Sequence, residues 1–163
     1  MGKEKYGKSE NNLFCVLDTP VGPLKINLIG GKIASVERTD EAPLKARDPV
    51  LKQLEQELAR YFVGEEIDFS AELLLTGTTF QKAVYDATRT IPYGEVRSYS
   101  DIARAIGKPG ASRAVGQALN KNRHLILVPC HRVVPKSGGI GGFKEGQEMK
   151  EYLLHLEREG HSE

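Results

Sequence analysis

Apolar and polar positions alternate with a period of two in the first part of the chain. This alternation is clearest over residues 24–28, and it is typical of a strand with one buried face. Gly30 and Gly31 then supply a hairpin turn, after which residues 33–36 return as an apolar run. The pattern predicts a small antiparallel meander over residues 12–38.

The period becomes helical after residue 48. Asp48 can cap a helix and Pro49 suits its first position, because proline has no N–H to leave unpaired there. Leucines recur at helical spacing from Leu51 to Leu58, and Gly64 is available to end the helix. We therefore expect one amphipathic helix in this part of the chain.

A boundary follows the first helix and a short extended stretch. Residues 67–74 are predicted to be extended, and residues 76–79 are rich in Thr and Gly. We expect two domains, residues 1–76 and 77–163. The fold class predicted is α/β (α+β), with a small sheet and a helix in the N-terminal domain and a mostly helical C-terminal domain.

Short helices dominate the second half. One begins at a Thr cap just before Phe80, and Ser100 and Ser112 can each cap another helix. The glycine-bearing turn at 107–110 separates these last two, which is the pattern of a helix-turn-helix, here winged-helix-like. Spacing alone favours an ordinary pair of packed helices.

The chain after the helix pair contains three further segments. The apolar run 125–128 predicts a buried strand that ends at Cys130, and residues 137–142 form a glycine-rich loop. A final helix follows. Its apolar stripe, which we expect to face the core, consists of Met149, Tyr152, Leu153 and Leu156.

Composition restricts the class of protein. The chain of 163 residues is 39% hydrophobic and 28% charged, as in soluble globular proteins. It has no apolar stretch of membrane-spanning length, and its first residues lack the apolar segment of a signal peptide. We expect a location inside the cell, in the cytoplasm, or in the nucleus of a eukaryote.

Cys15 and Cys130 are too few for a disulfide framework. No metal-ligand spacing occurs, so no metal is expected.

Charge is distributed unevenly although the net charge is only +1. Between Arg89 and Lys136 there are nine Lys and Arg but two Asp and Glu, whereas residues 1–77 have ten against thirteen. A basic segment beside an acidic one indicates that one part of the protein meets a polyanion. A solvated charged surface explains the same numbers equally well.

Candidate chemistry centres on Cys130, which His131 and Arg132 follow directly. A thiol has a reference pKa of about 8.5, so it needs a base or a cation to become a good nucleophile. His131 could take its proton, with Glu157 orienting the imidazole. Neighbours on a strand face opposite ways, so cooperation requires a backbone turn, with which Pro129 is consistent. The alternative is a buried structural cysteine beside a surface histidine, which composition alone favours.

Several ordered motifs change this balance. Pro129-Cys130-His131-Arg132-Val133 follows an apolar run, with Ser112-Arg113-Ala114-Val115-Gly116 and Gly94-Glu95-Val96-Arg97-Ser98-Tyr99 upstream. From about Phe80 to Glu157 the chain resembles the O6-alkylguanine-DNA alkyltransferase family, the methylated-DNA-protein-cysteine methyltransferases. The resemblance implies that Cys130 takes an alkyl group from O6 of guanine in double-stranded DNA, once per molecule, as a monomer and without a cofactor.

The resemblance also implies roles for individual residues. The catalytic ones would be Cys130, His131 as a base acting through a water, Glu157 as its orienting acid, Tyr99 as a donor toward guanine N3, and Asn122 as a hinge. Those at the DNA would be Arg113, which enters the base stack, Tyr99, Ser98, Ala114, Gly116, Gln117, Lys121 and Arg123. Those around the base would be Val128, Pro129, Ile140, Gly141, Gly142, Phe143, Lys144 and Lys150.

Two departures concern the loop around the base. Phe143 occupies a position that is often tyrosine, and Lys144 one where a small hydroxyl residue can contact the O6 side of the base. Two rival functions remain open from the sequence. One is a DNA-binding protein without transfer, either a helix-turn-helix regulator or a lesion binder. The other is a cysteine hydrolase that uses Cys130 and His131 and turns over many times.

Overall fold

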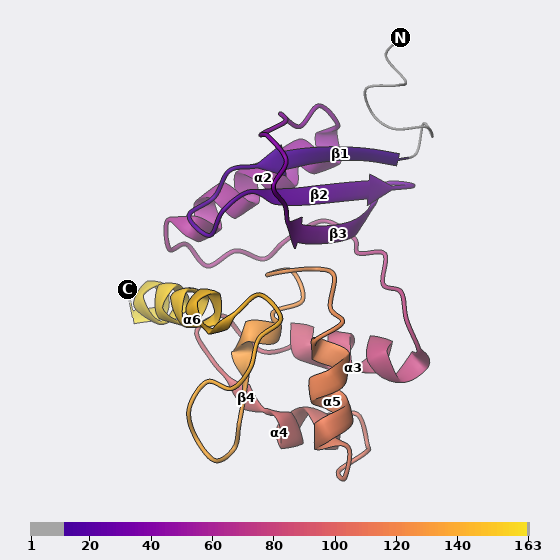
Figure 1. Ribbon diagram of the computed structural model, residues 1–163, viewed down its shortest axis with the longest axis vertical. Coiled ribbons are helices and arrows are strands. Elements are labelled where there is room, and N and C mark those ends of the chain that lie inside the picture. Colours follow the sequence, from indigo (N-terminus) through magenta and orange to yellow (C-terminus); the bar gives the residue numbers. More distant parts are fainter. Residues whose placement is uncertain (1–11, 163) are drawn as a thin grey trace. The chain divides into compact units, whose positions relative to one another are not determined.

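The protein divides into two compact units, one ending at Leu75 and the other beginning at Thr76. The computed structural model describes residues 12–162 (Figure 1). Within that range no helix is long and apolar enough to cross a membrane. The α/β fold class expected from the sequence is confirmed, with a small sheet in the first unit and mainly helices in the second.

The first unit contains a three-stranded antiparallel sheet in the order β1-β2-β3. Its strands are β1 (Asn12–Leu17), β2 (Leu24–Ile29) and β3 (Lys32–Arg38). Gly30 and Gly31 join β2 to β3 with φ angles of 58° and 81°, a left-handed turn that glycine adopts without strain. The predicted meander is confirmed, and the alternate residues of β2 are buried as the pattern required.

Helix α2 (Pro49–Phe62) completes the core of this unit. Asp48 caps it by accepting hydrogen bonds from the backbone N–H groups of Val50 and Leu51, at 2.8 and 3.3 Å. The leucines at helical spacing are fully buried, and Gly64, with φ of 97°, follows the last turn. The helix and both of its ends are therefore confirmed.

The expected extended stretch at 67–74 pairs with β3 only at one point. Ile33 donates its N–H to the carbonyl of Glu72 and accepts from the N–H of Leu74, both at 2.8 Å. The buried carboxylate of Glu57 on α2 accepts a hydrogen bond from the Ser70 hydroxyl at 2.9 Å. This segment is thus held against the unit by side-chain and backbone bonds, not by a continuous strand ladder.

The second unit begins with α3 (Thr79–Arg89), α4 (Tyr99–Ala105) and α5 (Ser112–Leu119). Helices α4 and α5, separated by a turn in which Gly107 has φ of 76°, form the helix-turn-helix (Figure 1). Tyr85 of α3 donates its hydroxyl to the carbonyl of Ala118 at 2.8 Å and so anchors α5. Strand β4 (Arg97–Ser98) pairs in parallel with β5 (Val133–Val134).

The caps expected for the helix pair were wrong in both cases. Ser98 caps α4, because its hydroxyl accepts from the N–H of Asp101 while Asp101 accepts from the N–H of Ser98. Ser100 lies inside the first turn and bonds to the Ser98 hydroxyl at 2.9 Å. Helix α5 starts at Ser112 itself, after Ala111, without a side-chain cap.

The apolar run before Cys130 was also wrongly assigned to a strand. Residues 125–128 are buried but form consecutive turns, in which Ile126 has a φ of 73°. Cys130 then begins the short 3-10 helix η1 (Cys130–Arg132). A continuous apolar run signals burial on all sides, and periodicity cannot separate a buried strand from buried turns.

Helix α6 (Gln147–Ser162) ends the described chain. Met149 and Leu153 are buried as expected and Leu156 is half-buried, but Tyr152 is 37% exposed. The inward face instead includes two charged residues, Lys150 and Glu157. The expected stripe was therefore wrong at Tyr152, because the buried face of α6 serves polar contacts as well as packing.

The capping box of α3 gives a first prediction. Thr78 accepts from the N–H of Gln81 at 3.0 Å, and the Gln81 side chain accepts from the N–H of Thr78 at 2.9 Å. Thr78→Ala should lower the free energy of unfolding by about 1 kcal/mol in urea denaturation, because it leaves an N–H unpaired. Thr79→Ala, one residue inside the helix, is the control. Equal losses in the two variants would contradict the role of the cap.

Candidate active site

Cys130 opens onto a cavity of about 300 Å³ in the second unit. Cys130 is only 8% exposed, so a substrate must reach its thiol through this cavity. The cavity has walls from the start of α4, from one face of α5 and from the loop before α6. Its lining residues are Tyr99, Arg113, Gly116, Gln117, Leu119, Asn120, Cys130, Gly142, Phe143 and Lys144.

Asn122, two residues beyond Asn120, organises the turns that lead to the thiol. Its side-chain N–H₂ donates to the carbonyl of Val128 at 3.1 Å and approaches the sulfur of Cys130 at 3.3 Å. Its side-chain oxygen accepts from the N–H of His124 at 2.9 Å. One buried amide therefore fixes the backbone on both sides of the run 125–128 and directs a donor at Sγ.

The backbone turn required for Cys130 and His131 to share a site is present. Pro129, with φ of −79° and ψ of 64°, precedes η1, and both following side chains are buried. His131 Nε2 lies 2.6 Å from Oε2 of Glu157 on α6. Because a carboxylate only accepts hydrogen bonds, Nε2 carries the proton, and Nδ1 is left with its lone pair.

His131 Nδ1 is the atom of the pair that is open to further chemistry. It is fully buried and has no hydrogen-bond partner within residues 12–162. No direct hydrogen bond joins Cys130 to His131 in that range either. A basic nitrogen one residue away from a thiol, without a direct bond to it, can take the sulfur's proton through one bridging molecule.

Arg132 is committed to fold contacts. Its Nε and Nη2 donate to the two oxygens of Glu157 at 2.8 and 3.1 Å, and its Nη1 donates to the carbonyl of Ile91 at 2.7 Å. Its guanidinium also lies 5.9 Å from the ring centroid of Tyr93. These contacts fix the local backbone around η1.

The electrostatics of the pair keep His131 neutral. Burial by itself raises the pKa of Glu157, but His131 and Arg132 outweigh it and hold that pKa well below its usual value. Burial lowers the pKa of His131, and the nearby Arg132 and Lys150 add to this, against the opposing effect of Glu157. The result is a carboxylate beside an uncharged imidazole that can still accept a proton.

The thiol itself is protonated at rest. Burial raises the pKa of Cys130 to about 11, and Glu145 adds slightly, whereas the Asn122 hydrogen bond and Lys150 lower it. Lys150, whose own pKa is lowered by burial to about 8, donates to the carbonyls of Val133 and Gly142 at 2.8 and 3.0 Å. A thiol in this state reacts only when a base removes its proton during the attack.

The cavity brings together many of the residues expected from the sequence. Besides Cys130 they are Tyr99, Arg113, Gly116, Gln117, Gly142, Phe143 and Lys144. Gly116 faces Tyr99, since a side chain starting there would meet the Tyr99 ring at 3.7 Å. Ala114 lies half-buried on α5, and Ser98 serves as the cap of α4.

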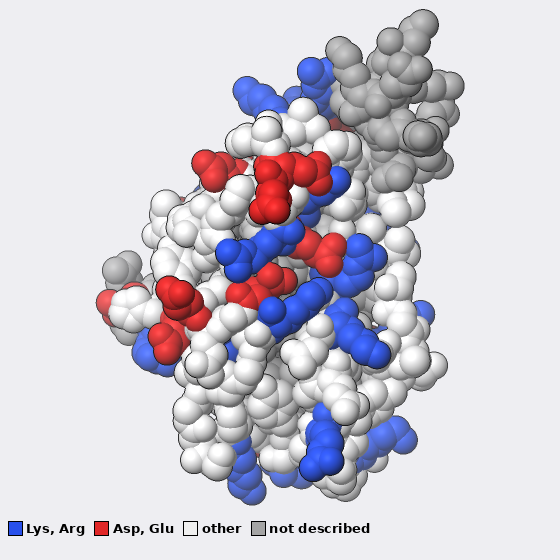
Figure 2. Space-filling model, viewed as in Figure 1, with Lys and Arg blue, Asp and Glu red and all other residues white. Residues whose placement is uncertain are grey.

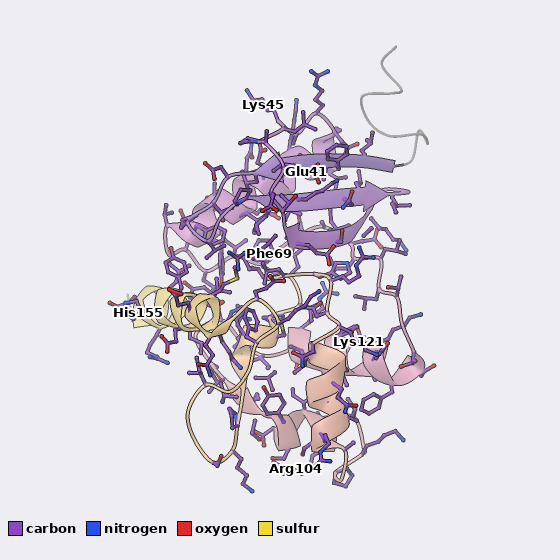
Figure 3. The ribbon with its side chains drawn as sticks, viewed as in Figure 1. Glu41, Lys45, Phe69, Arg104, Lys121 and His155 are labelled. Atoms are coloured by element: carbon purple, nitrogen blue, oxygen red, sulfur yellow. The ribbon has the colours of Figure 1, made fainter. Side chains whose placement is uncertain are left out.

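Other expected residues lie off this cavity. Lys121 and Arg123 are exposed beyond the end of α5, where Figure 3 labels Lys121. Val128 and Pro129 are buried just before the thiol, and Lys150 is buried beneath the loop. Gly141 is packed against Pro135 and the Tyr99 hydroxyl. Ile140 lines a separate cavity together with residues of α6.

Sequence reasoning missed two lining residues, Leu119 and Asn120. The signal for Asn120 was present, because this residue, directly after α5, continues the helical spacing of Arg113, Gly116 and Gln117. In the view of Figure 2, basic side chains outnumber acidic ones around the helix-turn-helix at the bottom, where Figure 3 labels Arg104. A face of this kind suits a polyanion.

The buried His131–Glu157 pair predicts a loss of stability in acid. In the unfolded chain the pKa of His131 is about 6.5 and that of Glu157 about 4.3, and both are lower in the folded protein. The unfolded chain therefore binds more protons below about pH 6.5, so the free energy of unfolding should fall as the pH falls. Urea denaturation over this range measures the slope.

His131→Gln provides the comparison for this pH series. Glutamine keeps a donor for Glu157 but does not titrate, so the variant should lose the part of the slope near about pH 6, whatever its overall stability. The same slope in variant and wild type would show that His131 is not the titrating group.

Comparisons with known proteins agree with this site. The family model for the DNA-binding domain of 6-O-methylguanine DNA methyltransferase matches residues 79–159. A methylated-DNA–protein-cysteine methyltransferase of Methanosarcina acetivorans is 38% identical over 154 residues, which are 88% of this chain and 97% of that protein. The constitutive enzyme of that name from Bacillus subtilis is 39% identical, over 93% of this chain and 99% of its own length.

A solved structure extends the likeness to the fold. The crystal structure of Mycobacterium tuberculosis OGT in complex with DNA has a TM-score of 0.80 and 41% sequence identity, and the match covers 89% of this chain and 92% of that one. The relatives span nearly the whole chain, including the first unit, which the sequence motifs did not reach. The resemblance is confirmed, and the chain belongs to the family of methylated-DNA–protein-cysteine methyltransferases.

Proposed function

We propose that this protein repairs DNA by transferring an alkyl group, methyl above all, from O6 of guanine to Sγ of Cys130. The observation that carries this proposal is a buried thiol at a cavity walled by the second helix of a helix-turn-helix. A DNA-binding regulator would not require a thiol at this position. A cysteine hydrolase would not require that one wall of its site be a DNA-binding helix. Family membership supports the same reading.

The proposed reaction is a displacement at the alkyl carbon. The sulfur forms a bond to that carbon while the bond from carbon to O6 breaks, and the bonding electrons pass into the guanine ring. His131 takes the thiol proton at Nδ1 through a water, with Glu157 holding the imidazole in place. Tyr99 donates its proton toward guanine N3. The thiol proton is then on His131 and the Tyr99 proton on guanine, and proton exchange with water returns both side chains to their neutral forms.

The surroundings of Tyr99 and Asn122 suit these roles. Burial raises the pKa of Tyr99, and Cys130 adds to this, so its hydroxyl stays protonated until the base arrives. The Asn122 N–H directed at Sγ stabilises charge as it develops on the sulfur. The product is a thioether, which is a poor leaving group, so each molecule acts once.

The DNA would bind along α5 in the minor groove, because a repair protein must accept any sequence around the lesion. Small or uncharged residues at Ala114, Gly116 and Gln117 allow close approach. Arg113, which is exposed on the cavity rim, would enter the stack and fill the place of the flipped nucleotide. Ser98, Lys121 and Arg123 would contact phosphates.

The base would occupy the cavity beside the glycine-rich loop. Phe143 offers an apolar wall, Gly142 allows close approach, and Lys150 holds the loop through the Gly142 carbonyl. This pocket would be supported from behind by Val128, Pro129, Ile140 and Gly141.

Double-stranded DNA would be the partner of a monomer acting without metal or cofactor. Because genomic DNA is its substrate, we place the protein inside the cell, in the nucleus if it is eukaryotic.

Mass spectrometry tests the transfer directly. After incubation with duplex DNA containing O6-methylguanine, the Cys130 peptide should gain the mass of one methyl group, and the lesion should disappear in equal amount. Cys130→Ser should still bind the duplex but leave the lesion intact. An unmodified peptide with an intact lesion would exclude the proposal. Repeated turnover would favour the hydrolase, and full protection of cells by Cys130→Ser would favour a binding protein.

The role of Arg113 can be separated from chemistry at sulfur. Arg113→Ala should slow transfer from duplex DNA about tenfold or more, because an extrahelical base costs a few kcal/mol of unpairing. Transfer from free O6-benzylguanine, which needs no flipping, should change little. Lys108→Ala, in the turn before α5, is the control. An equal loss with both substrates would instead place the defect in the pocket.

A further inference from the structure

The loop between β5 and α6 is fastened to α6 at two neighbouring glycines. Gln147 donates its side-chain amide to the carbonyl of Gly141 at 3.1 Å, and Lys150 donates to the carbonyl of Gly142 at 3.0 Å. A side chain added at Gly141 would come within 2.9 Å of Pro135, so this part of the loop is also closely packed. The base of the loop is therefore fixed from the side of α6.

Lys144 reaches in the other direction. Its Nζ donates a hydrogen bond to the main-chain carbonyl of Asn122 at 3.3 Å. Asn122 follows α5, and its own side chain approaches the sulfur of Cys130. Lys144 and Cys130 line the same cavity, together with the neighbouring Gly142 and Phe143 of the loop. This hydrogen bond thus connects the loop, which forms one wall of the cavity, to the segment directly after α5, which forms another wall.

We infer that Lys144 is a specificity-determining residue that sets the largest O6 substituent the cavity accepts, by tying the loop to Asn122. The inference rests on the proposed function and deepens it. At about 300 Å³ the cavity is at the small end of ligand pockets, and the guanine must already occupy much of it. A substituent much larger than methyl requires the loop to move away from α5.

That movement requires the hydrogen bond of Lys144 to break. Because Gly141 and Gly142 are held by α6, an outward movement of the loop is confined to the residues beyond them, and it separates Nζ from the Asn122 carbonyl. Lys144 positions the wall and takes no part in bond making. Its loss should therefore change the relative rates for large and small substituents more than the rate for methyl.

The experiment compares two substrates in one duplex sequence, O6-methylguanine and O6-benzylguanine, by the rate of Cys130 alkylation. Lys144→Met keeps the length of the side chain and removes the donor. It should raise the benzyl-to-methyl rate ratio about threefold or more, as expected for the loss of one hydrogen bond. Lys144→Arg retains a donor and should stay near the wild-type ratio. Lys136→Met, an exposed lysine of the same loop, should match wild type.

Each other outcome has a defined meaning. An unchanged ratio in Lys144→Met, with methyl transfer intact, would overturn the inference. A ratio that rises in Lys144→Ala but not in Lys144→Met would also overturn it, because side-chain bulk would then be the cause. Faster amide hydrogen exchange at residues 143–146 in Lys144→Met should accompany the altered ratio, and protection equal to wild type would count against the tether. Failure of wild type to transfer methyl would refute the proposed function instead.

Discussion

The carboxylate of Glu157 is the group on which the second unit depends. It is buried on α6 and binds both His131 and Arg132, which are consecutive in η1, and Arg132 extends the link to the carbonyl of Ile91 after α3. Three segments distant in sequence therefore meet at one charge. Removal of either charged member, Glu157 or Arg132, would leave the other charge buried without its counter-ion, which costs about 3–5 kcal/mol. The same network fixes the tautomer of His131, so stability and reactivity share one set of bonds.

Asn122 has a comparable role at a different scale. Its amide bonds the carbonyl of Val128 and the N–H of His124, and these bonds hold a stretch of backbone that has no ladder of its own. The same side-chain amide also donates toward Sγ of Cys130, so the group that holds this backbone contacts the thiol as well. The position of the thiol thus depends on how α5 ends, and α5 is in turn anchored by the hydroxyl of Tyr85. A partner that binds α5 is therefore connected to the sulfur through a single residue, Asn122.

Local signals predicted much of the fold. Asp48 with Pro49, and Gly30 with Gly31, specify their helix start and hairpin by short-range geometry alone, and the structure follows them. Ser98 and Ser100 are both good caps, and the choice between them depends on Asp101, which reciprocates only with Ser98. Residues 125–128 were wrongly assigned to a strand, because an all-apolar run indicates burial and not conformation. Ile126 has a left-handed backbone that only tertiary packing can impose.

The candidate site divides in the same way. The sequence singled out Cys130, His131 and Glu157, and the structure brings His131 and Glu157 into contact beside the thiol. The spacing of residues on α5 held the signal for Asn120. The bond from Lys144 to the Asn122 carbonyl had no such signal, since it depends on where a glycine-rich loop returns in space. Main-chain acceptors are present at every residue, so a sequence does not indicate which one a long side chain will reach.

Burial of Cys130 has a consequence for the time before any lesion is met. Oxidants such as peroxide attack the thiolate, and accessible, low-pKa cysteines are oxidised first. Cys130 is protonated and almost wholly covered, with a pKa raised to about 11 by burial. Burial therefore slows oxidation of the thiol that the proposed transfer consumes, so that it stays reduced until a substrate enters the cavity.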